Sequence, residues 1–234
     1  AVTALVYTKV LTRFTGLNST FDSWITRWYG KITRHRFPML PAPEGETWRD
    51  RDYPTALGRL REDFNQNLTA HGNWGHMILD EAQDFSKITH GFLNVVATQL
   101  FTHLESSKAP SITILADENQ RITGSNCTIQ EIRDAHFLEE KDIYALTKNY
   151  RNSTEIARFS RTFYVGTKTG IPNLPERRGN KPRLEITSDI DDAANQITNY
   201  ARNHENQEIG VLVMHTKTRT SIHKSLKEKY KGSK

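Results

Sequence analysis

The chain has 234 residues, of which 36% are hydrophobic and 25% are charged, a composition typical of a globular protein rather than a disordered one. No apolar run approaches the roughly 18 to 20 residues that span a bilayer, and no signal-peptide pattern is found, so we expect a cytoplasmic protein with no membrane partner. The single Cys127 excludes an intrachain disulfide. The net charge of +5 is compatible with a polyanionic partner.

The N-terminal part of the chain predicts one strand and three helices. Residues 2–7 predict the strand, and residues 8–14 predict a short helix. A second helix begins in the segment 20–24, for which Thr20 or Asp22 is a candidate cap. Residues 54–70 carry leucine and phenylalanine at helical spacing, which predicts an amphipathic helix.

Residues 31–53 predict an irregular excursion between these helices. The segment mixes arginines and a lysine with three prolines and the aromatic residues Phe37, Trp48 and Tyr53. Basic residues interleaved with aromatic ones suit a single nucleic-acid strand, since phosphates pair with cations and bases stack on rings. An ordinary solvated loop explains the same residues equally well.

Two apolar strands that end in carboxylates organise the middle of the chain. The run at 77–79 ends in Asp80 and Glu81, and the run at 111–117 ends in Asp117. A predicted helix at 86–105 joins them, which indicates a right-handed βαβ unit with both carboxyl ends at one sheet edge. We therefore expect four carboxylates to converge there, namely Asp80, Glu81, Asp84 and Asp117.

Carboxylates at such an edge have a chemistry of their own. An Asp holds Mg²⁺ directly or through water, because Mg²⁺ prefers oxygen ligands. A neighbouring Glu polarises an attacking water.

The rest of the chain alternates helices and strands. Helices are predicted at 128–136, from Ser153 onward and at 190–204, and a basic helix closes the chain. Strands are predicted at 142–147, 183–187 and 209–214, with a proline- and glycine-rich loop at 170–182. The alternation predicts an α/β fold with a parallel sheet.

Several segments together resemble, in chain order, the signature motifs of superfamily 1 helicases of the UvrD/Rep type. They are Tyr-Thr-Lys-Val-Leu at 7–11, Thr-Phe-Asp-Ser-Trp at 20–24, Asp-Glu-Ala-Gln-Asp at 80–84, Ala-Asp-Glu-Asn-Gln-Arg-Ile at 116–122 and Leu-Thr-Lys-Asn-Tyr-Arg-Asn-Ser at 146–153. The acidic box at 80–84 is the most specific match. The resemblance covers almost the whole chain, and it implies a RecA-like P-loop NTPase-type parallel sheet flanked by helices.

The resemblance also implies roles for individual residues. Asp80 would hold Mg²⁺, Glu81 would orient or deprotonate the attacking water, and Gln120 would sense the γ-phosphate of ATP. The remaining nucleotide contacts would be Gln83, Asp117, Tyr150 and Arg151. Gln83 would also link the site to the nucleic-acid face, Tyr150 would stack on adenine, and Arg151 would reach the γ-phosphate. The nucleic-acid contacts would be Tyr7, Lys9, Thr20, Phe21, Ser23 and Trp24.

The chain departs from the family pattern in ways that shape the prediction. It has no Gly-x-x-x-x-Gly-Lys-Ser/Thr loop, which in the family lies upstream of the first matched segment. Asp22 stands where a His is common, Ala116 replaces the usual Gly, and Thr123 replaces an aromatic residue, which argues against base stacking near residue 123.

We therefore expect an internal fragment of such a helicase. Residues 1–140 would form a first RecA-like lobe without its P-loop, with an insertion at about 30–74, and residues 141–234 would begin a second lobe. The parent would couple ATP hydrolysis to movement on single-stranded DNA, with ATP and Mg²⁺ as cofactors and RNA as a second candidate strand. The fragment alone would be inactive.

Two other functions compete with this prediction. One is a catalytically inactive RecA-like module that serves binding or interaction. The other is a Mg²⁺-dependent nuclease that uses the four carboxylates on two metal ions. The nuclease leaves Gln120 and Arg151 without a role.

Overall fold

The computed structural model describes residues 19–62, 72–101, 104–105, 108–121, 124, 126–164, 166 and 170–231. The predicted strand and helix at 2–14 lie outside the described residues, as do Tyr7 and Lys9, the end of the predicted helix at 54–70, and Thr123. The chain divides into two compact units, residues 1–150 with 160–174 and residues 151–159 with 175–234, and each is described by itself.

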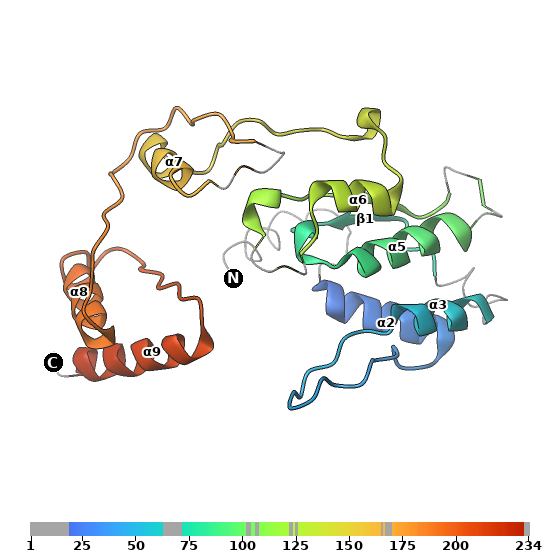
Figure 1. Ribbon diagram of the computed structural model, residues 1–234, viewed down its shortest axis with the longest axis horizontal. Coiled ribbons are helices and arrows are strands. Elements are labelled where there is room, and N and C mark those ends of the chain that lie inside the picture. Colours follow the sequence, from blue (N-terminus) through green and yellow to red (C-terminus); the bar gives the residue numbers. More distant parts are fainter. Residues whose placement is uncertain are drawn as a thin grey trace. The chain divides into compact units, whose positions relative to one another are not determined.

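The described part of the chain contains seven α-helices and two strands (Figure 1). The helices are α2 (Phe21–Thr33), α3 (Tyr53–Glu62), α5 (Lys87–Gln99), α6 (Ile129–His136), α7 (Thr154–Arg161), α8 (Ile190–Arg202) and α9 (Thr216–Lys231). The strands are β1 (His76–Leu79) and β2 (Ser111–Ile114). Single 3₁₀ turns occupy Ala82–Asp84, Glu118–Gln120 and Glu140–Asp142.

The two strands form a parallel sheet, joined through α5. Their register pairs His76 with Ser111 and Leu79 with Ile114, so both strands end at the same edge. Helix α5 packs against α3 and α6. The predicted α/β class and the parallel pairing of the two strands are thereby confirmed, whereas the RecA-like fold stays a prediction.

Helices α2, α3 and α5 build the hydrophobic core of the first unit. Ile25 and Tyr29 of α2, Leu60 of α3 and Leu93 of α5 are fully buried, at the helical spacing visible in the sequence. Aromatic rings fill the space between the helices, with Phe92 at 5.2 Å from Tyr53 between ring centroids. This core fixes α5, and therefore the residues that precede it after β1.

Two helices begin where their capping residues predict. Thr20 caps α2, because its hydroxyl accepts a hydrogen bond from the Ser23 backbone N–H at 3.3 Å. Thr128 and Glu131 form a reciprocal capping box at the start of α6. Both caps satisfy backbone donors that the first helical turn leaves unpaired.

The strands predicted at 142–147, 183–187 and 209–214 are wrong. None of these segments joins a ladder among the described residues, and apolar side chains in them are exposed, with Ile186 at 91% and Leu212 at 97%. A strand needs a neighbour for its backbone N–H and C=O groups, so hydrophobic pattern alone does not produce one. Within the described residues, no helix is long and apolar enough to cross a membrane.

Candidate functional site

The acidic turn after β1 is held against the end of β2. The Leu115 N–H donates to the Leu79 carbonyl and the Ala82 N–H donates to the Leu115 carbonyl, each at 2.9 Å. Between them, Glu81 adopts a left-handed backbone conformation with φ 51° and ψ 41°. Non-glycine residues rarely adopt this left-handed conformation, and those that do are concentrated at functional sites. The backbone hydrogen bonds therefore hold the acidic turn in one conformation at the edge of the sheet.

Gln83 is the centre of this edge. Its side chain is buried, its amide nitrogen donates to Glu81 Oε2 at 2.8 Å, and its amide oxygen accepts from the Asp117 N–H at 3.0 Å. Its backbone carbonyl accepts from the Cys127 N–H at 2.8 Å. One residue thus connects the acidic turn, the segment after β2 and the segment before α6.

The segment after β2 continues the same chain of hydrogen bonds. The Asp117 carboxylate accepts from the Gln120 side-chain amide at 2.8 Å and from the Asn119 N–H at 3.0 Å. Glu81, Gln83, Asp117 and Gln120 are therefore linked in a row. The sequence predicted these four residues as parts of one site, and three hydrogen bonds between them bring them together.

Asp80 and Asp84 lie at the two ends of the turn. Asp80 is half-buried and makes no hydrogen bond or ion pair with the residues that the structure describes. Asp84 accepts a hydrogen bond from the Asn126 side chain at 2.8 Å. No three His, Cys, Asp or Glu side chains of the described residues gather where they could hold a metal ion. The expected carboxylates therefore do not form a metal-binding cluster among these residues. Instead, the Gln83 amide bridges the Glu81 carboxylate and the Asp117 backbone N–H.

Two histidines, His90 and His136, hold the acidic turn through a hydrogen bond to its backbone. His90 of α5 is fully buried, and its Nε2 donates to the Ala82 carbonyl at 2.9 Å. Its Nδ1 must then accept, so His136 Nε2 of α6 donates to it at 3.0 Å. Burial lowers the pKa of His136 to about 4, with His90 as the second cause, and burial also lowers the pKa of His90. Both rings are therefore neutral near pH 7.

The predicted nucleic-acid residues of α2 differ in their surroundings. Trp24 is half-buried between Trp28 and Trp74, with ring centroids at 5.6 and 5.7 Å. Phe21 lies 4.8 Å from Phe85, which directly follows the acidic turn. Thr20 and Ser23 are exposed at the helix start. The two aromatic residues thus belong to the core cluster as well as to the predicted nucleic-acid segment.

Tyr150 and Arg151 are neighbours in sequence and belong to different units. Tyr150 is the last residue of the stretch 1–150 of the first unit and is 76% exposed, with the Lys148 ammonium 5.5 Å from its ring centroid. Arg151 begins the second unit and is exposed. An exposed ring beside a cation is a surface that a planar base can stack on.

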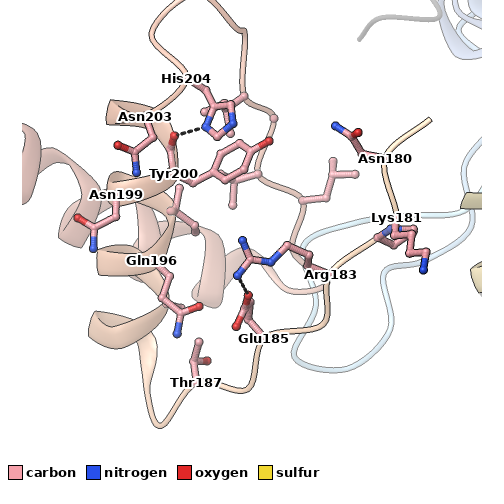
Figure 2. A pocket seen from close by; sticks show the side chains of 17 residues that line it. Asn180, Lys181, Arg183, Glu185, Thr187, Gln196, Asn199, Tyr200, Asn203 and His204 are labelled. Atoms are coloured by element: carbon pink, nitrogen blue, oxygen red, sulfur yellow. Dashed lines mark hydrogen bonds and ion pairs between the residues drawn. The ribbon is translucent and has the colours of Figure 1, made fainter. Parts of the chain in front are cut away.

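The second unit contains an open cavity of about 1100 Å³ (Figure 2). Its walls come from side chains between residues 180 and 187, from α8 with the following Asn203 and His204, and from residues 209–212. Tyr200 and His204 stack with ring centroids 4.0 Å apart, and Arg183 pairs with Glu185 at 2.6 Å. No site residue predicted from the sequence lies among the residues that line it.

His90, His136 and Asn126 were not predicted from the sequence as parts of this site. His90 and His136 are 46 residues apart, and Asn126 is 42 residues from its partner Asp84. No motif spacing connects such positions. The one sequence signal for these contacts is His90, a histidine on the apolar face of the helix that follows the acidic box.

The comparisons bear on the chain as a whole. A family model described as Schlafen group 3, DNA/RNA helicase domain, matches residues 49–234, which include the acidic turn, the Asp117–Gln120 segment and all of the second unit. A comparison with curated proteins found none that matches. The predicted helicase-like character and nucleic-acid partner are confirmed, while the UvrD/Rep type stays a prediction. Because the match covers well over half of its length, the chain belongs to the Schlafen group 3 DNA/RNA helicase domain family.

Proposed function

We propose that this chain is part of an ATP-dependent helicase or translocase of the superfamily 1 UvrD/Rep type that moves on single-stranded DNA. One observation carries the proposal. Glu81, Gln83, Asp117 and Gln120 form a hydrogen-bonded row where two parallel strands end. Open α/β sheets bind their ligands at this edge. The row ties a candidate base to a candidate phosphate sensor through one buried amide.

One side chain of the turn, the Asp80 carboxylate, suits a magnesium ion that keeps most of its waters. Asp80 offers a half-buried carboxylate without a partner among the described residues, and Mg²⁺ prefers oxygen ligands and retained waters. A bound Mg²⁺ would neutralise the charge of the ATP phosphates. Glu81 accepts one hydrogen bond at Oε2 from Gln83, which orients the carboxylate and leaves Oε1 to accept a proton from water.

The other residues have supporting roles in this proposal. One amide hydrogen of Gln120 binds Asp117, so the second remains for a phosphate oxygen. Tyr150 supplies an exposed ring for the base, and Arg151 a guanidinium for the γ-phosphate. Thr20, Phe21, Ser23 and Trp24 would contact the DNA strand, where the Phe21–Phe85 contact adjoins the acidic turn.

The test is Glu81→Gln in the intact protein that contains this chain. Glutamine retains the volume and an oxygen that accepts the Gln83 hydrogen bond, but it is not a base. We expect ATP turnover to fall by at least about 100-fold, within the range of general-base catalysis, while nucleotide binding persists. Steady-state hydrolysis and equilibrium nucleotide binding measure the two effects.

The exposed Glu44→Gln is the control, since it removes one carboxylate outside the site. Near-normal turnover in Glu81→Gln would remove Glu81 from the catalytic role. An unmodified protein that binds DNA yet hydrolyses no ATP would favour the inactive binding module instead.

A further inference from the structure

Helix α9 is strongly basic for its length. Its 16 residues include six lysines and arginines and one glutamate, a net charge of +5. The formal net charge of the whole chain is also +5. The other segments together therefore sum to zero net charge, with basic and acidic stretches among them, and α9 is one of the strongly basic segments of the protein.

The packing of α9 turns most of this charge outward. The helix contacts α8, as Figure 1 shows, and Ser225 is buried there, donating to Asp191 at 2.6 Å. Ile222 and Leu226 are half-buried. At 100° per residue, Lys217, Lys224 and Lys227 fall on the opposite side, and all three are exposed.

These cations are not neutralised by the described part of the protein. Lys217, Lys224 and Lys227 make no ion pair with the residues that the structure describes, and Ser221 adds an exposed hydroxyl to the same face. Thr220 is exposed there too, but its hydroxyl donates to the Thr216 carbonyl at 3.0 Å. The three lysines span about 15 Å of helix, comparable with the length of a few nucleotides. We call Lys217, Thr220, Ser221, Lys224 and Lys227 the basic face.

We propose that the basic face of α9 binds the phosphate backbone of a nucleic-acid strand. This inference rests on the nucleic-acid partner in the proposed function, and adds a contact in the second unit to those of α2. Lysines are mobile point charges, and the Ser221 hydroxyl can donate to a phosphate oxygen, so the face suits contact without sequence readout.

The distribution of apolar residues favours nucleic acid over a lipid surface. A helix that lies in a membrane interface buries a wide apolar face among the acyl chains. The apolar residues Ile222 and Leu226 of α9 are instead partly covered, on the side away from the basic face. The exposed side of α9 therefore presents charged and hydroxyl groups, which suit a phosphate backbone, and, among its described residues, no apolar face that could enter a membrane.

The test is the triple variant Lys217→Gln, Lys224→Gln and Lys227→Gln in the full chain. Binding to a fluorescent oligothymidine strand is measured over a range of salt concentrations without nucleotide. Each lost phosphate contact lowers the slope of log K against log salt by about 0.7, so we expect a slope smaller by about 2 and an affinity at least about tenfold lower at low salt.

The matched control is Lys108→Gln, Lys141→Gln and Lys181→Gln, which removes the same charge from exposed sites elsewhere. It should retain the slope of the unmodified chain. Glutamine has a helix propensity close to that of lysine, so equal far-ultraviolet circular dichroism is expected for both variants.

Equal losses in the two triple variants, or an unchanged slope in the α9 variant, would overturn the inference. Loss of binding to phosphatidylserine-rich vesicles with unchanged DNA binding would assign the face to lipid and overturn it as well. Since the assay needs no ATP, a failed Glu81→Gln prediction leaves this result intact, so the two proposals fail separately.

Discussion

At the scale of single residues, Gln83 is central because an amide donates and accepts at once. A carboxylate at this position would place a third negative charge beside Glu81 and Asp117, and an apolar side chain would leave the Asp117 N–H without this acceptor. Its burial makes the two bonds strong, since little water competes with them. The position of the Glu81 carboxylate therefore depends on Gln83, a residue that itself neither accepts nor gives up a proton.

The histidine pair makes stability depend on pH. The folded pKa of His136 is about 4, below the ordinary value near 6.5, so between these values the unfolded chain binds a proton that the folded chain does not. The stabilisation is complete above about pH 6.5 and is lost as pH falls toward 4. His90 acts in the same direction, because its pKa is also lowered by burial.

We predict that His136→Gln weakens this pH dependence. The glutamine amide can donate to His90 Nδ1 as the imidazole does, but it does not titrate. The thermal midpoint of the full chain should therefore fall less between pH 7 and pH 5 in the variant, as followed by circular dichroism. His35→Gln, at an exposed histidine, is the control. An identical fall in His136→Gln and the unmodified chain would contradict the role of the pair.

At the scale of elements, α2 combines a structural start with a predicted nucleic-acid segment. Thr20 caps the helix. Arg51, two residues before α3 begins, binds the Asp22 carboxylate at 3.1 Å and donates to Thr26 Oγ1 at 3.2 Å. The Arg51 guanidinium also lies 5.4 Å from the Phe37 ring centroid. The excursion at 34–52 is therefore anchored at its end to the first turns of α2.

Substitutions at Thr20 separate capping from binding. Thr20→Ala removes the cap and should cost about 1 kcal/mol in the free energy of unfolding. Thr20→Asp keeps a capping oxygen and adds a charge that suits the helix start, so stability should be retained. The same charge repels phosphate, so oligothymidine binding should weaken.

Urea unfolding and the salt-dependent binding assay measure these two effects. Thr47→Ala, at an exposed threonine, should change stability by less than about 0.5 kcal/mol. If Thr20→Asp is stable and binds the strand as tightly as the unmodified chain, Thr20 is a cap and not a nucleic-acid contact.

At the scale of the whole molecule, nucleotide affinity should be limited by a missing element. The backbone amides and lysine of a P-loop cradle the β- and γ-phosphates, and no such run occurs in the 234 residues. The carboxylates of the acidic turn cannot replace them, because they repel phosphate unless Mg²⁺ is bound.

We predict that this chain by itself binds Mg·ATP with a Kd above about 100 µM and shows no DNA-stimulated turnover, because the main phosphate contacts are absent. Isothermal calorimetry and a hydrolysis assay measure both quantities. Oligothymidine binding by the same sample serves as the control for folded protein. A low-micromolar Kd would contradict the prediction.

The sequence by itself determined the features that depend on neighbours within a few residues. The starts of α2 and α6 follow from Thr20 and Thr128, and α5 follows from apolar residues at helical spacing. The acidic turn after β1 and the parallel pairing with β2 were also predictable, since two apolar runs joined by a helix favour one arrangement.

The tertiary structure decided which of these residues meet. It inserted Gln83 between Glu81 and Asp117, joined His90 to His136 across 46 residues, and left residues 183–187 and 209–214 outside any described ladder. Such contacts depend on the packing of distant elements, where an apolar pattern fits a paired strand and an exposed segment alike. Local free energies select a helix start or a turn, but only the packed chain selects partners, because each distant contact must offset the entropy of closing the loop between its residues.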